Sequence, residues 1–128
     1  MAYTSRKKGE QMGTNFYYFK DKITEQTDPC SGLHIGKCSG GWVFNFEAHP
    51  QENLMSVKQY RKFLKEGVIY DEYGDLISYR NFWKKVESTL KSEFGYKPYT
   101  FDDGVQLHFQ AAVEWLDEGF VFTLGDFS

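Results

Sequence analysis

The chain has 128 residues and a formal net charge of -3 at pH 7; hydrophobic residues make up 41% of it and aromatic residues 19%. This is the size of a single domain with one core, and the many large side chains exclude an intrinsically disordered chain. No apolar run approaches the ~18 residues that a membrane-spanning helix needs, and no apolar stretch follows the basic first residues to form an export signal. We therefore expect a cytoplasmic protein that does not bind membranes.

The first half of the chain carries strand and turn patterns. Residues 14–20 include four consecutive aromatic residues and predict a strand with both faces partly covered, and residues 23–32 predict a loop. Residues 33–36 and 42–48 predict two more strands, joined by a tight turn over residues 37–41. Apolar and other residues alternate over residues 42–48. This alternation predicts that one set of side chains, Trp42, Phe44 and Phe46, faces inward and that another, Val43, Asn45 and Glu47, faces outward.

Two helices are predicted in the middle of the chain, each beginning after a serine N-cap. Ser56 precedes apolar residues at helical spacing up to Gly67, which stands where a C-cap glycine is common. Ser78 precedes a second helix with one wide apolar stripe. The residues of this stripe are Tyr79, Phe82, Trp83, Val86 and Leu90.

Short strands complete the predicted fold. Residues 68–70 and 76–77 flank a turn in which Gly74 supplies a positive φ. Strands are also predicted over residues 105–109 and 120–122, on either side of a short helix or turn at residues 111–118. The sequence thus predicts an α+β fold, a small antiparallel sheet packed against two main helices. We expect one domain over residues 13–128, preceded by a flexible leader over residues 1–12.

A glycine-rich segment between two predicted strands is the candidate binding site. Its glycines let the backbone approach a ligand and expose successive N–H groups, while Lys37 and Ser39 offer a charge and a donor to phosphate. The spacing is not that of a P-loop, and a plain glycine-rich hairpin turn is the open alternative. The expected ligand-binding residues are His34, Gly36, Lys37, Ser39, Gly40, Gly41 and Trp42, together with Asn15, Tyr17 and Tyr73.

Metal binding and covalent catalysis have weaker signals in the same segment. Cys30, His34 and Cys38 are four residues apart, with His49 nearby, so they are a weak alternative zinc site. No Cys-x2-Cys pair is present, and we expect neither a metal nor another cofactor. His34 beside Cys38 or Ser39 matches no signature of nucleophilic catalysis, so a binding protein is favoured over an enzyme.

Charge is unevenly distributed along the chain. Residues 101–128 contain six acidic residues and no Lys or Arg, a pattern typical of an acidic partner surface or of solvated faces. The first predicted helix has the opposite pattern, a basic stripe that could contact phosphates, an acidic partner protein or only solvent. The stripe consists of Lys58, Arg61, Lys62 and Lys65. A pI of about 5.6 disfavours nucleic acid as the partner.

Several distinctive motifs are spread along the chain. They are Met12-Gly13-Thr14-Asn15-Phe16-Tyr17, His34-Ile35-Gly36-Lys37 followed by Ser39-Gly40-Gly41-Trp42, Asp71-Glu72-Tyr73-Gly74, Asp117-Glu118-Gly119-Phe120 and Asp126-Phe127-Ser128. With these motifs the chain resembles a family of small uncharacterised bacteriophage and prophage proteins over nearly all of residues 12–128. Many members carry a Cys-x2-Cys pair, of which this chain keeps only Cys30. The resemblance implies a phage setting and points to the segment around His34.

Small phage proteins without an enzyme signature commonly act by binding. We expect a non-enzymatic counter-defence or host-takeover protein that binds a phosphorylated small ligand, such as a nucleotide immune signal, at residues 34–42. One alternative is an inhibitor that uses the acidic C-terminal third against a host defence or nucleic-acid-processing protein. Another is a nucleotide hydrolase with His34 as general base. A homo-oligomer is left open.

Overall fold

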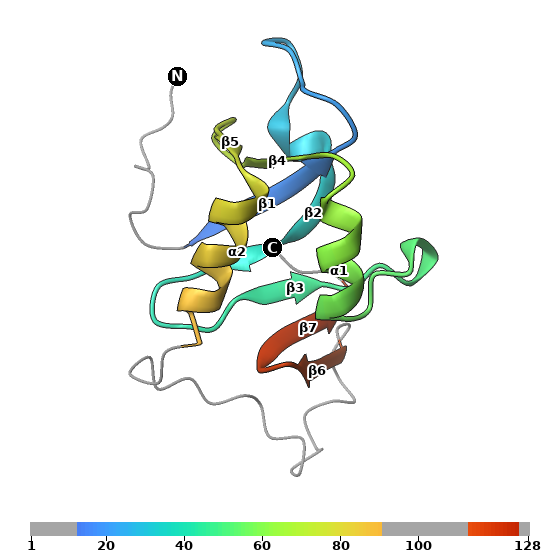
Figure 1. Cartoon of the computed structure of the whole chain (residues 1–128), viewed down its shortest axis with the longest axis vertical. Coiled ribbons are helices and arrows are strands. Elements are labelled where there is room, and N and C mark those ends of the chain that lie inside the picture. Colours follow the sequence, from blue (N-terminus) through green and yellow to red (C-terminus); the bar gives the residue numbers. More distant parts are fainter. Residues whose placement is uncertain (1–12, 91–112, 126–128) are drawn as a thin grey trace.

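A computed structural model describes residues 13–90 and 113–125 of the chain. These residues form an α+β fold in which a seven-stranded sheet packs against two helices, as the sequence predicts (Figure 1). The strands are β1 Thr14–Phe19, β2 Leu33–Cys38, β3 Asn45–Glu47, β4 Val68–Asp71, β5 Leu76–Ile77, β6 Val113–Asp117 and β7 Phe120–Leu124. The helices are α1 Val57–Leu64 and α2 Tyr79–Ser88, with short 3-10 turns η1 Pro29–Ser31 and η2 Pro50–Glu52.

The sheet is mixed rather than purely antiparallel. Its strand order is β5-β4-β1-β2-β3-β7-β6, and every neighbouring pair is antiparallel except β3 and β7, which run parallel. The sequence does not predict this pairing, because the partners Phe46 and Phe122 are too far apart in the chain for a turn to set their direction. The predicted leader and the predicted strand at residues 105–109 lie outside the described residues.

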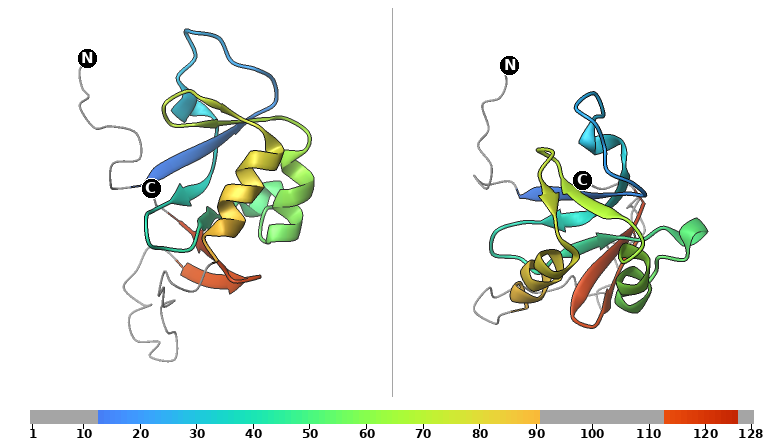
Figure 2. Two further views of the ribbon diagram at one scale, coloured as in Figure 1. Left: turned by 60° about the vertical axis from the view of Figure 1, so that its left-hand side comes forward. Right: turned by 45° about the horizontal axis from the view of Figure 1, so that its top comes forward.

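Both helices lie on the same face of the sheet and enclose an aromatic core (Figure 2). At the centre of this core, the ring of Phe46 stacks on that of Phe122 with centroids 5.0 Å apart, and Trp115 stacks on the same Phe122 at 5.8 Å. Phe46 and Phe122 are fully buried, and burying one such side chain contributes roughly 1.5–3 kcal/mol. The odd and even residues of β3 therefore separate cleanly between the core and the opposite face of the sheet.

The two predicted serine N-caps are confirmed. The hydroxyl of Ser56 accepts a hydrogen bond from the amide of Gln59, and that of Ser78 accepts one from Asn81. The buried stripes are Val57, Tyr60 and Leu64 on α1, and Phe82, Trp83 and Val86 on α2. None of the helices in the described part of the chain is long and apolar enough to cross a membrane.

The structure corrects the predicted facing of the strand at residues 42–48. Trp42 is 51% exposed and Val43 is buried, the reverse of the expected pattern. A turn in which the amide of Trp42 donates to the carbonyl of Ser39, with Gly41 at φ +81, delays the strand until Asn45. The alternation that places side chains on opposite faces therefore begins three residues later than predicted.

Two other predicted features also differ. Helix α1 ends at Leu64 with Lys65 as its C-cap, so Gly67 does not cap it. Gly67 is instead required for close packing against β1, because a Cβ there would lie 2.4 Å from the carbonyl oxygen of Phe19. The segment predicted as a helix or turn at residues 111–118 contains strand β6, which pairs with β7 through a tight turn at Glu118 and Gly119, both at positive φ. In β6, Trp115 pairs with Phe122 of β7 and stacks on its ring.

Candidate functional site

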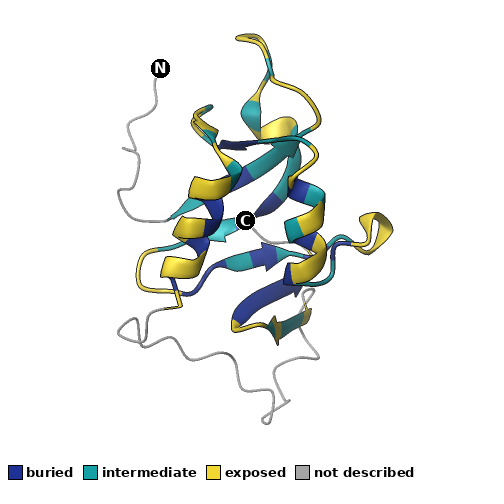
Figure 3. Cartoon of the chain, viewed as in Figure 1, coloured by how far each residue is buried: buried dark blue, intermediate teal, exposed yellow. Residues whose placement is uncertain are grey.

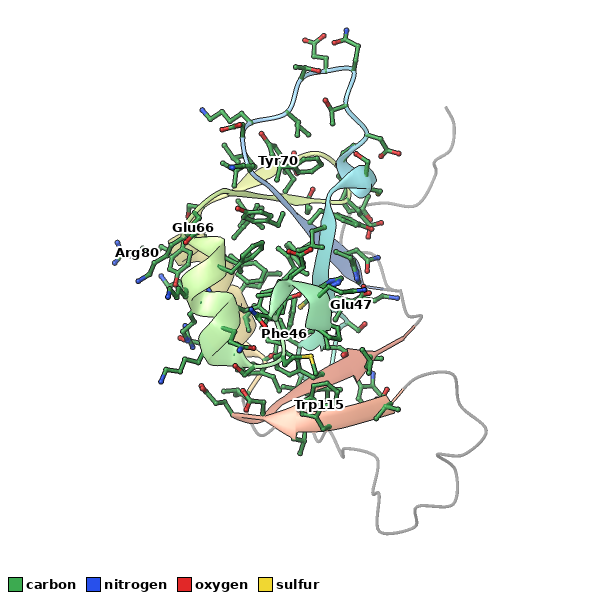
Figure 4. The ribbon with its side chains drawn as sticks, turned by 90° about the vertical axis from the view of Figure 1, so that its right-hand side faces the viewer. Phe46, Glu47, Glu66, Tyr70, Arg80 and Trp115 are labelled. Carbon is green, nitrogen blue, oxygen red and sulfur yellow. The ribbon has the colours of Figure 1, made fainter. Side chains whose placement is uncertain are left out.

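The sheet face away from α1 and α2 carries a row of polar residues on adjacent strands. Asn15 of β1 lies opposite Lys37 of β2, which in turn lies opposite Asn45 of β3. Directly opposed residues share a face of the sheet. Because Phe46 faces the core, its neighbours Asn45 and Glu47 project to the other side, as Figure 4 shows for Glu47. This face is thus polar over the central strands of the sheet, where side chains that serve only packing are usually apolar.

His34 is held at the centre of this face by two acceptors. Its Nδ1 lies 2.6 Å from Oε1 of Glu47, and its Nε2 lies 2.8 Å from Oδ1 of Asn15. The side-chain amide of Asn15 donates to Glu72, which fixes its oxygen toward His34. Both ring nitrogens are thus engaged by side chains of neighbouring strands, and the His34 side chain is only 13% exposed. In this arrangement neither ring nitrogen of His34 is open to a substrate.

Asn15 in turn joins β1 to the end of β4. The backbone amide of Asn15 donates to Oε1 of Glu72 at 2.7 Å, and the amide of Glu72 donates back to the carbonyl of Asn15 at 2.9 Å. The carboxylate of Asp71 accepts from the amides of Tyr73 and Asp75 and shapes the following turn, in which Gly74 has the predicted positive φ. Polar contacts therefore run from β4 through β1 and β2 to β3.

Two further side chains fix the β3 end of this network. Nε2 of His49 donates to the carbonyl of His34 at 2.7 Å, and its Nδ1 lies 4.0 Å from Oε2 of Glu47. From the core side, the hydroxyl of Tyr60 donates to the carbonyl of Glu47 at 2.7 Å. Burial raises the pKa of this phenol well above its ordinary value, so it remains a donor. Glu47 is consequently held through both its side chain and its backbone.

Tyr17 belongs to the same face but is turned toward η1. Its ring lies 5.2 Å from that of His34, between centroids, and its hydroxyl is hydrogen-bonded to the thiol of Cys30. Burial, followed by this hydrogen bond, raises the pKa of the phenol well above its ordinary value. The ring of Tyr17 therefore packs beside that of His34 and is not part of the glycine turn.

The glycine turn forms the end of the β2–β3 hairpin. Gly40 and Gly41 have open space where a Cβ would stand, and Trp42 beside them is half exposed. Gly36, in contrast, lies inside β2, where a Cβ would come within 2.3 Å of the carbonyl oxygen of Asn45. Gly36 is thus required by strand packing, whereas Gly40 and Gly41 form an accessible loop.

The predicted site residues accordingly fall into two neighbouring groups. Asn15, Tyr17 and His34 form the interlocked group on the sheet face, and residues 39–42 form the accessible turn. Lys37 connects them, because it lies on the sheet face one residue before the strand ends at Cys38. Tyr73 is found in the β4–β5 turn, next to Glu72 rather than in the glycine turn.

The three residues of the weak zinc alternative do not converge. Cys30 lies in η1 against Tyr17, His34 lies on the polar face, and Cys38 packs against the core on the helix side. Residues 13–90 and 113–125 contain no group of three His, Cys, Asp or Glu side chains arranged to hold a metal ion. Burial raises the pKa of the Cys38 thiol, although Lys85 acts in the opposite direction, and a protonated thiol is a poor nucleophile and metal ligand.

Sequence reasoning missed two carboxylates that organise the site. The sequence predicts an outward position for Glu47 but no partner, and it indicates no role for Glu72. Both act through contacts across strands, Glu47 on His34 and Glu72 on Asn15, and 57 residues separate the second pair. Only the alternation of β3 carries a local signal, since it places Glu47 on the same face as Asn45.

Some acidic side chains of the C-terminal hairpin, formed by β6 and β7, make contacts within the fold. Oδ2 of Asp117 accepts a hydrogen bond from the amide of Val57 at 2.8 Å and so caps the N-terminus of α1. Glu114 is hydrogen-bonded to Thr123, and burial raises the pKa of its carboxyl group. Of the three acidic residues that an inhibitor would present here, Glu118 in the turn is exposed, whereas Glu114 and Asp117 are partly buried.

Comparisons with protein-family models, with curated protein sequences and with solved structures find no match for this chain. The resemblance to small bacteriophage proteins therefore stays a prediction. The function is inferred from the chain's own geometry, above all from the contrast between an interlocked His34 and an accessible glycine turn.

Proposed function

We propose that the chain is a non-enzymatic binding protein that holds a phosphorylated small ligand at Lys37 and the turn of residues 39–42. One observation carries this proposal: the half-exposed indole of Trp42 stands next to the unobstructed backbone of Gly40 and Gly41. An accessible indole can stack on a nucleobase, and glycine amides together with an ammonium group bind phosphate. The proposed setting is a phage-encoded counter-defence or host-takeover protein in the cytoplasm of the host, with a nucleotide immune signal as ligand.

The state of His34 favours binding over hydrolysis. A general base needs a free lone pair within reach of the attacking water, and both ring nitrogens of His34 face acceptors at 2.6 and 2.8 Å. The Cys38 thiol is kept protonated by burial on the other side of the sheet. The interlocked residues thus serve to hold β1, β2 and β3 in register beneath Lys37 and the turn.

Calorimetry and tryptophan fluorescence with a defined panel test this function. The panel contains AMP, a cyclic mononucleotide, a cyclic dinucleotide and inorganic triphosphate. We expect at least one member to bind and to be recovered chemically unchanged. Lys37→Gln should weaken this binding about ten- to a hundredfold, because it removes a charge-assisted contact worth about 1.5–3 kcal/mol. Trp42→Ala should weaken the binding of the nucleotides but not that of inorganic triphosphate.

A matched control separates the site from general charge. Lys22→Gln removes the same charge from an exposed residue of the loop after β1, and it should change affinity less than twofold. The proposal is wrong if no member of the panel binds, or if Lys37→Gln and Trp42→Ala bind like the unchanged protein. Conversion of a nucleotide during the titration would favour the hydrolase alternative.

A further inference from the structure

The outer side of the helix pair carries a row of charged residues on each helix. Those on α1 and its C-cap are Lys58, Arg61 and Lys65, and those on α2 are Arg80, Lys84 and Glu87. Residues three or four positions apart share one side of a helix, so each row lies along a single side. Nη2 of Arg61 contacts Oε2 of Glu87 at 2.9 Å, which shows that the two rows face each other. We call these six residues the helix-pair surface.

Other charged residues of the helices lie on different sides. Lys62 and Glu66 line a cleft of about 310 Å³ between α1 and the segment at residues 52–54. Lys85 acts on the thiol of Cys38 and therefore lies at the opposite flank of α2. The helix-pair surface is left with five cations and one carboxylate in a chain whose formal net charge is -3. The rest of the chain is accordingly acidic, and positive charge is concentrated on this surface.

The centre of the surface is held by contacts of Arg61, and its margins are accessible. The guanidinium of Arg61 lies 4.2 Å over the ring of Trp83, and the hydroxyl of Tyr79 donates to the carbonyl of Arg61. Lys58, Lys65, Arg80 and Lys84 are exposed, and Figure 3 shows exposed outer sides on both helices. Figure 4 shows Arg80 projecting away from the sheet. Arginine is enriched among the central residues that carry most of the binding energy in protein interfaces, and Arg61 lies at the centre of this surface with exposed cations around it.

We propose that the helix-pair surface docks an acidic surface of a partner protein. Carboxylates spaced along one side of a partner helix would meet cations spaced by one turn on α1 and α2, and such complementarity raises the rate and specificity of association. This surface lies on the helix side, and the Lys37 site lies on the other face of the sheet, so the two proposals are independent. A chain that binds a ligand on one face can in this way be tethered to a protein through the other.

Nucleic acid fits the surface less well than a protein does. Among the aromatic residues of the helices, Tyr60, Phe82 and Trp83 are buried in the core, and Phe63 and Tyr79 are partly buried against it. None of them is well placed to stack on bases. An extended polyanion would also meet the acidic remainder of the chain, whereas a bounded acidic patch meets only the helices. Arg61 already shares its guanidinium with Glu87, which leaves mainly lysine point charges for phosphates.

Fluorescence anisotropy with a labelled oligo-glutamate peptide at low ionic strength tests the proposal. The variant Lys65→Gln/Lys84→Gln removes one exposed cation from each helix, and Lys20→Gln/Lys22→Gln removes two exposed cations from the loop after β1. Both variants change the net charge equally, and neither residue pair contacts the core. We expect the first variant to weaken peptide binding about five- to tenfold and the second to change it less than twofold.

Three outcomes would overturn the inference. Equal weakening by both variants would mean that total charge, and not this surface, attracts the peptide. Tighter binding of a single-stranded or duplex DNA oligonucleotide than of the peptide, with the same dependence on Lys65 and Lys84, would assign the surface to nucleic acid. Concentration-dependent assembly in sedimentation, lost in Lys65→Gln/Lys84→Gln, would make a second copy of the chain the occupant.

Discussion

Nε2 of His34 donates a hydrogen bond to the side-chain oxygen of Asn15, and the same amide group donates to Glu72. One asparagine thus couples a histidine of β2 to the end of β4. Replacing His34 by alanine should lower the free energy of unfolding by about 1–3 kcal/mol, because Asn15 and the partly buried Glu47 lose their partner. Chemical denaturation measures this loss. The exposed Asn81→Ala should stay within about 0.5 kcal/mol of the unchanged protein, and equal stability of both variants would exclude a structural role for the network.

The glycines of the candidate site should respond differently to the same substitution. Gly36→Ala forces a Cβ against the carbonyl oxygen of Asn45 and should destabilise the protein by about 1–3 kcal/mol. Gly41→Ala should cost about 1–2 kcal/mol because Gly41 has a positive φ. Gly40→Ala meets open space and should be almost neutral for folding. Thermal denaturation of the three variants gives the order, and a reversed order of Gly36 and Gly40 would contradict the assignment of the turn as accessible.

Trp83 should be among the most sensitive core positions. Trp83→Ala should lower the free energy of unfolding by roughly 3–5 kcal/mol, since it empties the centre of the buried stripe on α2. Trp83→Phe should lose less than half as much. The indole N–H is buried without an acceptor among the described residues, so its removal sacrifices no hydrogen bond there. A phenylalanine variant as unstable as the alanine variant would show that ring size and the contact with Arg61 dominate.

The two thiols should differ in their reaction with iodoacetamide at mildly alkaline pH. Cys30 is exposed, whereas Cys38 is partly buried against the core. Burial raises the pKa of both thiols, so access of the reagent distinguishes them. We expect Cys30 to react about tenfold faster, measured by mass spectrometry on Cys30→Ser and Cys38→Ser variants. As the pH rises past the ordinary thiol pKa of about 8.5, the unfolded Cys38 ionises before the folded one. Its contribution to stability is therefore complete at neutral pH and declines at alkaline pH.

Local patterns predict the helices and one hairpin well, because their signals lie within a few residues. Ser56 and Ser78 cap helices as expected, and Gly74 has the positive φ that its turn requires. The predictions were wrong where a tight turn or a hairpin contact, and not the local composition, goes with the observed structure. Residues 113–117 become a strand through Trp115 and Phe122, and Trp42 turns outward because a tight turn postpones the strand.

The residues of the candidate site likewise divide into those that the sequence predicts and those that it does not. Composition alone points to the segment from His34 to the glycine turn, and the structure does bring His34 together with Asn15 and Tyr17. Glu47 and Glu72 could not be found in this way, since their hydrogen bonds join strands whose order no local pattern specifies. A single sequence records which groups are available, whereas the order of the strands determines which of them meet.

The parallel pairing of β3 with β7 has a consequence for how this chain is made. During synthesis, β1 to β5 and both helices leave the ribosome long before β7 does. Until β7 follows, one edge of β3 is unpaired and one side of Phe46 is not covered by Phe122. In this interval the nascent chain exposes an unpaired strand edge next to an aromatic surface, a combination that promotes aggregation with other chains. Solubility of this protein in the cell should therefore be limited by how quickly the C-terminal hairpin follows, and chaperones that bind exposed strands should act within that interval.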